Sequence, residues 1–186
     1  MHAARHNLIA LLGRHRPADA TEAEMLSRTL EFVEREERSL DASLAEGHIT
    51  ASAWVVSRGE CTSVLLTHHR KLERWFQLGG HLEPGETALE GALREAREES
   101  GLTDVRALNA EIFDVDVHLI PVRGSMPAHY HYDVRFLLDG PMDAPLIATS
   151  ESRSLAWVRL AETHRYNESE SIQRMVRKTV YGNTSA

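Results

Sequence analysis

Three glutamates crowd the second half of a 24-residue stretch, Gly79 to Leu102, whose residue types could support metal-dependent chemistry. At about 100° per residue of an α-helix, Glu95, Glu98 and Glu99 fall within an arc of about 100° on one flank. Mg²⁺ prefers oxygen ligands, commonly a few carboxylates together with water and substrate phosphates. Cations bound there could neutralise the charge developing on a phosphate group and activate a water. The spacing therefore makes a divalent-metal site geometrically possible.

The same run of charge has a simpler interpretation. A sequence such as REAREE usually forms a solvated helix face whose charges pair with one another, and Arg94 and Arg97 could supply the cations. The helix alone would favour this interpretation. The residues that flank the glutamates are therefore needed to distinguish a metal site from a solvated face.

The flanking residues keep a fixed spacing. Gly80 is followed after five residues by Glu86, and after seven more by Arg94-Glu95. Two residues further stands Glu98-Glu99, and one further Gly101-Leu102. This pattern resembles the Nudix box, G-x5-E-x7-R-E-U-x-E-E-x-G-U, where U is aliphatic. All seven fixed residues match, which favours the metal site over the solvated face.

Two departures from the family pattern are small. Ala96 occupies the first aliphatic position, where a larger side chain is usual, and Leu78 stands where many members carry proline. Neither change removes a carboxylate, so the metal site implied by the resemblance is intact.

The resemblance implies a set of metal ligands. In the family, the equivalents of Glu95, Glu98 and Glu99 bind the metal, often with the backbone carbonyl at Gly79. One of these glutamates, or one from a distant loop, acts as the base. Glu151, which precedes a predicted strand, is therefore a candidate outer ligand or base, although a solvated loop carboxylate is the commoner role for such a residue.

Two other fixed residues have supporting roles in the family. The equivalent of Arg94 orients the first glutamate, and the equivalent of Glu86 supports the geometry between loop and helix. With Glu95, Glu98 and Glu99 they form the expected catalytic set. The all-oxygen ligands imply Mg²⁺ or Mn²⁺ as the cofactor.

The composition of the chain fits a globular protein with one well-packed domain. It has 186 residues, of which 42% are hydrophobic and 26% charged. A net charge of −7 argues against binding to nucleic acid or to acidic membranes, since both favour a basic surface. It does not argue against a small nucleotide-type substrate, because bound metal supplies positive charge locally.

The single cysteine and the short apolar runs restrict the compartment. Cys61 has no second cysteine with which to form an internal disulfide, which suits a reducing cytoplasm. The apolar run of residues 8–12 is too short for a signal-peptide core or a membrane span. We therefore expect a cytoplasmic protein.

The predicted elements suit an α/β (α+β) fold. We expect helices near residues 3–13, 21–38, 87–100 and 168–181, and strands near residues 48–57, 63–67, 105–120, 130–138 and 154–160. Thr87 with Glu90 forms a capping box that starts the glutamate helix, and Gly101 ends it. This order fits a mixed sheet between helices, the α/β/α sandwich of the Nudix fold.

The first two helices precede the usual family core. Thr21 with Glu24 is expected to cap the second helix, which would bury Met25, Leu26, Leu30 and Val33. We expect residues 1–46 to form an N-terminal helical extension and residues 47–186 the Nudix hydrolase domain. Packing or formation of a homodimer is the expected role of the extension.

Arg70 and Lys71 follow a predicted strand just before the box. They could donate charge-assisted hydrogen bonds to a substrate phosphate, and a solvated hairpin loop is an equally good interpretation. His81, in the box loop, is a further candidate for substrate binding.

The strands near residues 105–120 and 130–138 carry polar residues at every second position. His118 on one, and His131 and Arg135 on the other, could line a substrate pocket. An antiparallel pair with its polar face in water is the alternative. An extra metal site made with the neighbouring aspartates ranks below both, because the spacing matches no specific metal motif.

The main hypothesis is a metal-dependent pyrophosphohydrolase that cleaves a nucleoside diphosphate linked to another group by attack of water on phosphorus. A nucleotide-binding or regulatory module that kept the fold and lost the chemistry is the alternative, although such modules usually lose box glutamates. An isomerase on the same fold would need a catalytic cysteine, and Cys61 lies in no recognisable site motif.

Overall fold

The computed structural model describes residues 2–122, 124, 127–150 and 152–182. The chain divides into two units. The first unit consists of the chain up to Ser52 together with residues 80–92 and 110–136, and the remaining segments form the second. Strands β1, β4 and β7 and helix α3 contribute residues to both units.

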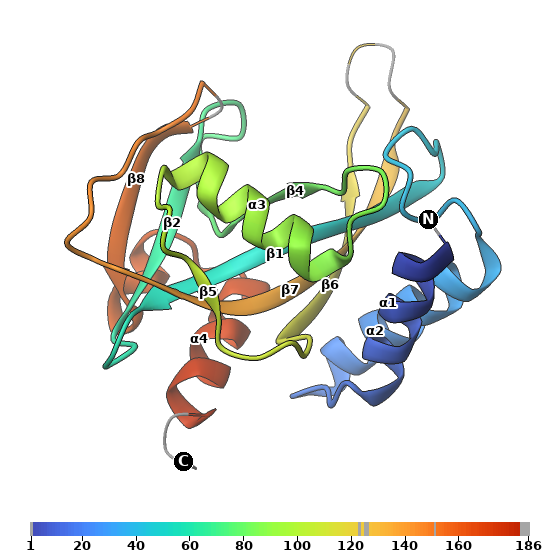
Figure 1. Ribbon diagram of the computed structural model, residues 1–186, viewed down its shortest axis with the longest axis horizontal. Helices are drawn as coiled ribbons and strands as arrows, with labels where there is room; N and C mark the ends of the chain where they lie inside the picture. The colour runs from blue at the N-terminus through green and yellow to red at the C-terminus, as the bar shows by residue number, and fades with distance from the viewer. Residues whose placement is uncertain (1, 123, 125–126, 151, 183–186) are drawn as a thin grey trace. The chain divides into compact units, whose positions relative to one another are not determined.

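The elements follow the predicted order of helices, strands, box helix, strands and C-terminal helix (Figure 1). The helices are α1 (His2–Arg14), α2 (Ala20–Arg35), α3 (Ala88–Ser100), the 3₁₀ helix η1 (Leu160–Arg165) and α4 (Glu170–Gly182). The strands are β1 (Gly47–Ser57), β2 (Ser63–His69), β3 (Arg74–Phe76), β4 (Leu78–His81), β5 (Arg106–Ala107), β6 (Asp114–Ile120), β7 (His129–Gly140) and β8 (Ser152–Arg159). The expected α/β (α+β) class is confirmed.

The described strands are hydrogen-bonded into one sheet. Its order is β3-β2-β1-β7-β5, and in addition β4 pairs with β1, β6 with β7, and β8 with β2. The sequence pattern did not predict β3 and β4, because strands of three and four residues show too little alternation to be recognised.

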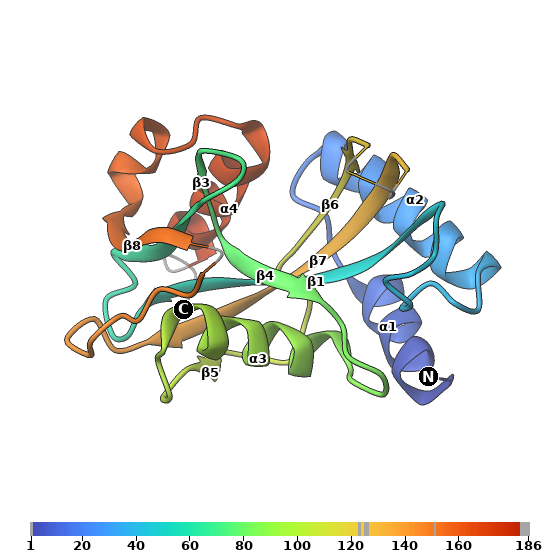
Figure 2. The same ribbon diagram turned by 90° about the horizontal axis from the view of Figure 1, so that it is seen from above.

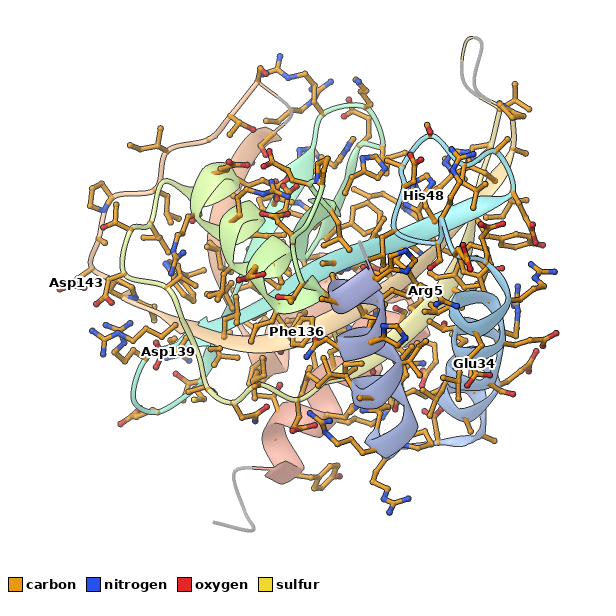
Figure 3. All side chains as sticks on the ribbon, turned by 45° about the vertical axis from the view of Figure 1, so that its right-hand side comes forward. Arg5, Glu34, His48, Phe136, Asp139 and Asp143 are labelled. Carbon is orange, nitrogen blue, oxygen red and sulfur yellow. The ribbon has the colours of Figure 1, made fainter. Side chains whose placement is uncertain are left out.

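In the first unit, α1 and α2 lie side by side next to β6 (Figures 1 and 2). Arg5 on α1 donates hydrogen bonds of 2.8 Å to the carbonyls of Val33 and Glu34 in the last turn of α2 (Figure 3). A cation at a helix C-terminus satisfies carbonyls that have no partner within the helix. The extension thus packs within its own chain, and a homodimer remains a prediction.

The predicted cap of α2 is wrong. The side chain of Asp19, not that of Thr21, caps the helix by accepting a hydrogen bond of 2.8 Å from the amide of Glu22. Asp19 has the extended backbone of an N-cap residue, which leaves Thr21 already inside the first turn.

The predicted buried face of α2 is also partly wrong. Val33 is buried as expected, but Met25, Leu26 and Leu30 are only half-buried, and the other buried positions are Glu22, Thr29 and Phe32. The carboxylate of Glu22 causes this rotation, since it accepts hydrogen bonds from the ring of His15 at 2.8 Å and from the amide of Val115 on β6 at 3.2 Å.

In the second unit, β2 pairs antiparallel with β3 and with β8. Ile172 and Met175 on α4 are buried, and so is Thr179, whereas Val180 is 46% exposed. The hydroxyl of Thr179 accepts a hydrogen bond of 2.9 Å from the buried indole of Trp54. A buried indole N–H needs such a partner, which explains why a polar residue faces the core.

Candidate active site

The loop between β4 and α3 is held by Glu86. Its carboxylate accepts a hydrogen bond of 2.8 Å from the amide of Glu83, and its own amide donates to the Glu83 carbonyl at 3.1 Å. Gly85 between them has φ +95°, a conformation that favours glycine. The geometry is compatible with the supporting role that the family resemblance implies for Glu86.

Thr87 and Glu90 form the predicted capping box at the start of α3. The Glu90 carboxylate accepts hydrogen bonds of 2.8 Å from both the amide and the hydroxyl of Thr87. The pKa of Glu90 lies below its usual value because the Thr87 amide, and then the hydroxyl, donate to the ionised form. Gly101, with φ +74°, ends the helix as expected.

The flank of α3 carries the three box glutamates within the second unit. Arg94 donates to Glu95 at 2.9 Å and to Glu98 at 3.0 Å, so one guanidinium contacts two of the carboxylates. The third, on Glu99, accepts a hydrogen bond of 3.3 Å from the amide of Gly79. Glu95 is largely buried whereas the Glu98 side chain is 58% exposed. The carboxylates are thus fixed by partners at one edge and open to solvent at the other.

These groups fit a hard divalent cation. Glu95, Glu98 and Glu99 offer only oxygen atoms, the donor type that Mg²⁺ and Mn²⁺ take. The contact between Glu99 and the amide of Gly79 brings that part of the backbone next to the glutamates. Glu151, the candidate outer ligand, lies outside the described residues.

Arg70 and Lys71 lie in the hairpin between β2 and β3, in the same unit as the box glutamates. Both are exposed, and the guanidinium of Arg70 donates to the carbonyl of Ser152 at 3.3 Å. The segment forms a solvated hairpin, which is one of the two interpretations that the sequence left open. Binding of a substrate phosphate by these residues remains a prediction.

His81, His118 and His131 are brought together in the first unit. His118 on β6 lies directly opposite His131 on β7, and their ring centroids are 5.6 Å apart. The centroids of His81 and His131 are 5.4 Å apart. The structure therefore brings together the three histidines that the sequence suggested for substrate binding.

Sequence reasoning missed two further histidines of this group. His48, at the start of β1, and His129, at the start of β7, both have ring centroids within 5.2 Å of His131 (Figure 3 labels His48). His129 could have been found, since it stands two residues before His131 on the same strand face. His48 gave no such signal, because only the folded sheet brings β1 beside these residues.

Arg135 is buried in an ion-pair cluster. Its guanidinium donates to Asp133 at 2.8 Å and Asp114 at 3.0 Å and lies 3.2 Å from Asp116. Burial acts to lower the pKa of Arg135, but the three carboxylates outweigh it and raise that pKa above its ordinary value. With its side chain only 3% exposed, Arg135 is used for cohesion between β6 and β7. The polar face of these strands is therefore buried here rather than solvated.

Cys61 lies in the turn between β1 and β2. It has φ +50°, and its thiol donates a weak hydrogen bond to the carbonyl of Gly59. This contact fits a structural position in the turn. The interactions described for Cys61 include no side chain that could activate its thiol.

Comparison with known proteins identifies the class. The family model of the NUDIX domain matches residues 47–179. This match covers more than half of the chain, so the chain belongs to the NUDIX family, and its class is that of the Nudix hydrolases.

Individual relatives agree with this class. A protein of Bacillus subtilis (strain 168), named provisionally as an 8-oxo-dGTP diphosphatase, is 38% identical over 63 residues, or 34% of this chain and 41% of that protein. The chain thus matches less than half the length of this curated relative.

Two solved structures show the fold. The C. elegans Ap4A hydrolase in a binary complex has a TM-score of 0.60 at 15% identity, over 74% of this chain and 98% of that one. The E. coli dihydroneopterin triphosphate pyrophosphohydrolase has a TM-score of 0.53 at 17% identity, over 72% and 95%. The expected Nudix-type fold is therefore confirmed.

Among the described residues, no helix combines the length needed to cross a membrane with sufficient apolar character.

Proposed function

We propose that this protein is a metal-dependent pyrophosphohydrolase. It would cleave a pyrophosphate bond in a nucleoside diphosphate linked to another group, through attack of water on phosphorus. The observation that carries the proposal is the complete set of box glutamates on one flank of α3, held by Arg94 and by the amide of Gly79. Membership of the NUDIX family supports it.

The residues of the box have different proposed roles in the reaction. Glu95, Glu98 and Glu99 would hold Mg²⁺ or Mn²⁺, and the bound cation supplies charge neutralisation and water activation. Arg94 keeps two of the carboxylates in position while it screens their repulsion. One of the glutamates acts as the base that takes a proton from the attacking water.

The substrate is expected to be a small nucleotide-type compound. The relatives are named for activity on 8-oxo-dGTP, Ap4A and dihydroneopterin triphosphate, so these compounds come first in the panel to be tested. Arg70 and Lys71 are proposed to contact its phosphates, since both are exposed on a hairpin of the unit that holds the glutamates.

The experiment is an activity panel. The protein is incubated with Mg²⁺ or Mn²⁺ and a set of nucleotides, dinucleoside polyphosphates and nucleotide sugars, and phosphate is measured after coupling to a phosphatase. We expect turnover of at least one compound and complete loss of turnover after exhaustive treatment with EDTA. No turnover across the panel, with metal bound, would favour the alternative of a nucleotide-binding or regulatory module.

A further inference from the structure

Five histidines gather in the first unit, on strands β1, β4, β6 and β7. They are His48, His81, His118, His129 and His131. The ring centroid of His48 lies 4.8 Å from those of both His81 and His131 and 5.1 Å from that of His129. So many imidazoles in one place offer several nitrogen lone pairs to the same small volume.

His48 is the most unusual member. Its side chain is 0% exposed, and neither of its ring nitrogens has a hydrogen-bond partner. A buried polar group without a partner is unfavourable and needs an explanation. A ligand that takes up one of these nitrogens would provide it.

Hydrogen bonds orient His131. The Nδ1 of His129 lies 2.9 Å from the carbonyl of Pro127, which only accepts, so this Nδ1 carries a proton. The Nε2 of His129 lies 3.3 Å from the Nε2 of His131. This contact takes up the Nε2 of His131 and leaves its Nδ1 as the candidate ligand atom. Metal-binding histidines are commonly oriented by a hydrogen bond at their other ring nitrogen.

We propose that His48, His81 and His131 together bind one transition-metal ion, for which Zn²⁺ is the best match. One ligand atom from each residue lies within 4.8 Å of the others. Every corner of such a triangle lies within about 2.8 Å of a common centre, and zinc–nitrogen bonds are about 2.0–2.1 Å long. Each ring would therefore have to move by less than about 1 Å.

The donor set separates this site from the box glutamates. Imidazole nitrogen suits Zn²⁺ and related ions, whereas Mg²⁺ takes oxygen. His81 is exposed, so solvent reaches the site from its side and a water can occupy the fourth position of a tetrahedral ion. The proposal stands independently of the hydrolase function.

The test is metal binding by the full chain. Metal-free protein is titrated with ZnCl₂ in excess Mg²⁺ by calorimetry, and with Co²⁺ by visible absorption. We expect one Zn²⁺ per chain, a higher melting temperature when it is bound, and the intense visible bands of four-coordinate Co²⁺. The variant His81→Ala should bind Zn²⁺ at least about 10²-fold more weakly, and because His81 is exposed the variant should fold normally.

Three matched variants control this result. His118→Gln changes a histidine of the same group that is not a proposed ligand, and His6→Gln removes an exposed histidine from α1. Both should bind within about threefold of the wild type. Glu98→Gln, which changes a proposed ligand of the box site, should still bind Zn²⁺ like the wild type. Failure of the zinc proposal can therefore be distinguished from failure of the hydrolase proposal.

Two results would overturn the proposal. One is a wild-type protein that binds no Zn²⁺ in excess Mg²⁺. The other is a ligand set that does not behave as assigned, with His81→Ala equal to the wild type or His118→Gln as weak as His81→Ala.

Discussion

Individual residues of the box helix have clearly different surroundings. Arg94 contacts Glu95 and Glu98, whereas Glu99 accepts from the amide of Gly79. The salt bridges expected of a solvated face are therefore present for two of the glutamates, together with the spacing expected of a metal site. The partner described for Glu99 is a backbone amide rather than Arg94, so a substitution there best distinguishes an effect on turnover from an effect on stability.

We expect Glu99→Gln to melt close to the wild-type temperature in EDTA, because a glutamine oxygen can still accept from Gly79. It should lose the stabilisation that the wild type gains from added Mg²⁺, and its turnover should fall by roughly 10²-fold. Thermal melts with and without Mg²⁺, set beside kcat, check this. A variant that melts lower in EDTA and keeps most of its activity would mean that Glu99 belongs to a charged surface only.

Arg135 offers a test of cohesion between β6 and β7. Replacing it by methionine leaves Asp114, Asp116 and Asp133 buried without their cation, so the free energy of unfolding should fall by about 3–5 kcal/mol. Urea denaturation measures this.

The matched control is Arg153→Met, which breaks an exposed pair with Glu73 and should lose less than about 1 kcal/mol. Equal losses in the two variants would contradict the structural role assigned to Arg135.

At the scale of elements, the start of α3 depends on the ionised form of Glu90. Its pKa is lowered in the folded protein, so its contribution to stability is present above the unfolded value near 4.5 and is lost as pH falls through the folded value. Glu90→Gln should therefore be less stable than the wild type at pH 7, and the difference should shrink as the pH falls below 4.5. Urea denaturation at pH 7 and at a series of lower pH values measures this difference. A difference that stays constant over the series would argue against an ionised cap.

Local patterns predicted some elements well. Thr87 and Glu90 mark the start of α3 because a capping box involves only residues three apart, and the alternation on β6 and β7 placed His118 and His131 on the same face. The cap of α2 was misplaced because Asp19 and Thr21 are both good capping residues and only the backbone conformation separates them.

Long-range contacts could not be predicted. The buried position of Glu22 depends on the amide of Val115, 93 residues further along the chain, and that of Thr179 depends on the indole of Trp54. His48 joins the other histidines for the same kind of reason. The box glutamates were recognisable because their spacing is local, whereas the surroundings of the histidines are set by strand pairing.

For the whole molecule, the two units hold donor sets of different chemistry. Carboxylates gather in the second and imidazoles in the first. Mg²⁺ prefers carboxylate oxygens and Zn²⁺ binds well to imidazole nitrogens. The chain is therefore expected to bind the two cations independently. A net charge of −7 favours cation binding in general, so specificity has to come from the ligands.

The most direct test of the account is the kcat of three proteins with Mg²⁺ on the best substrate of the panel. They are the wild type, Glu98→Gln and Glu90→Gln, which carry the same substitution on the same helix at a proposed metal ligand and at the cap. We expect kcat to fall by roughly 10²-fold or more in Glu98→Gln and to be nearly unchanged in Glu90→Gln. Glu98 is 58% exposed, so its loss should leave the fold intact. Wild-type turnover in Glu98→Gln, or turnover by any of the three in EDTA, would contradict a metal-dependent hydrolase built on the box glutamates.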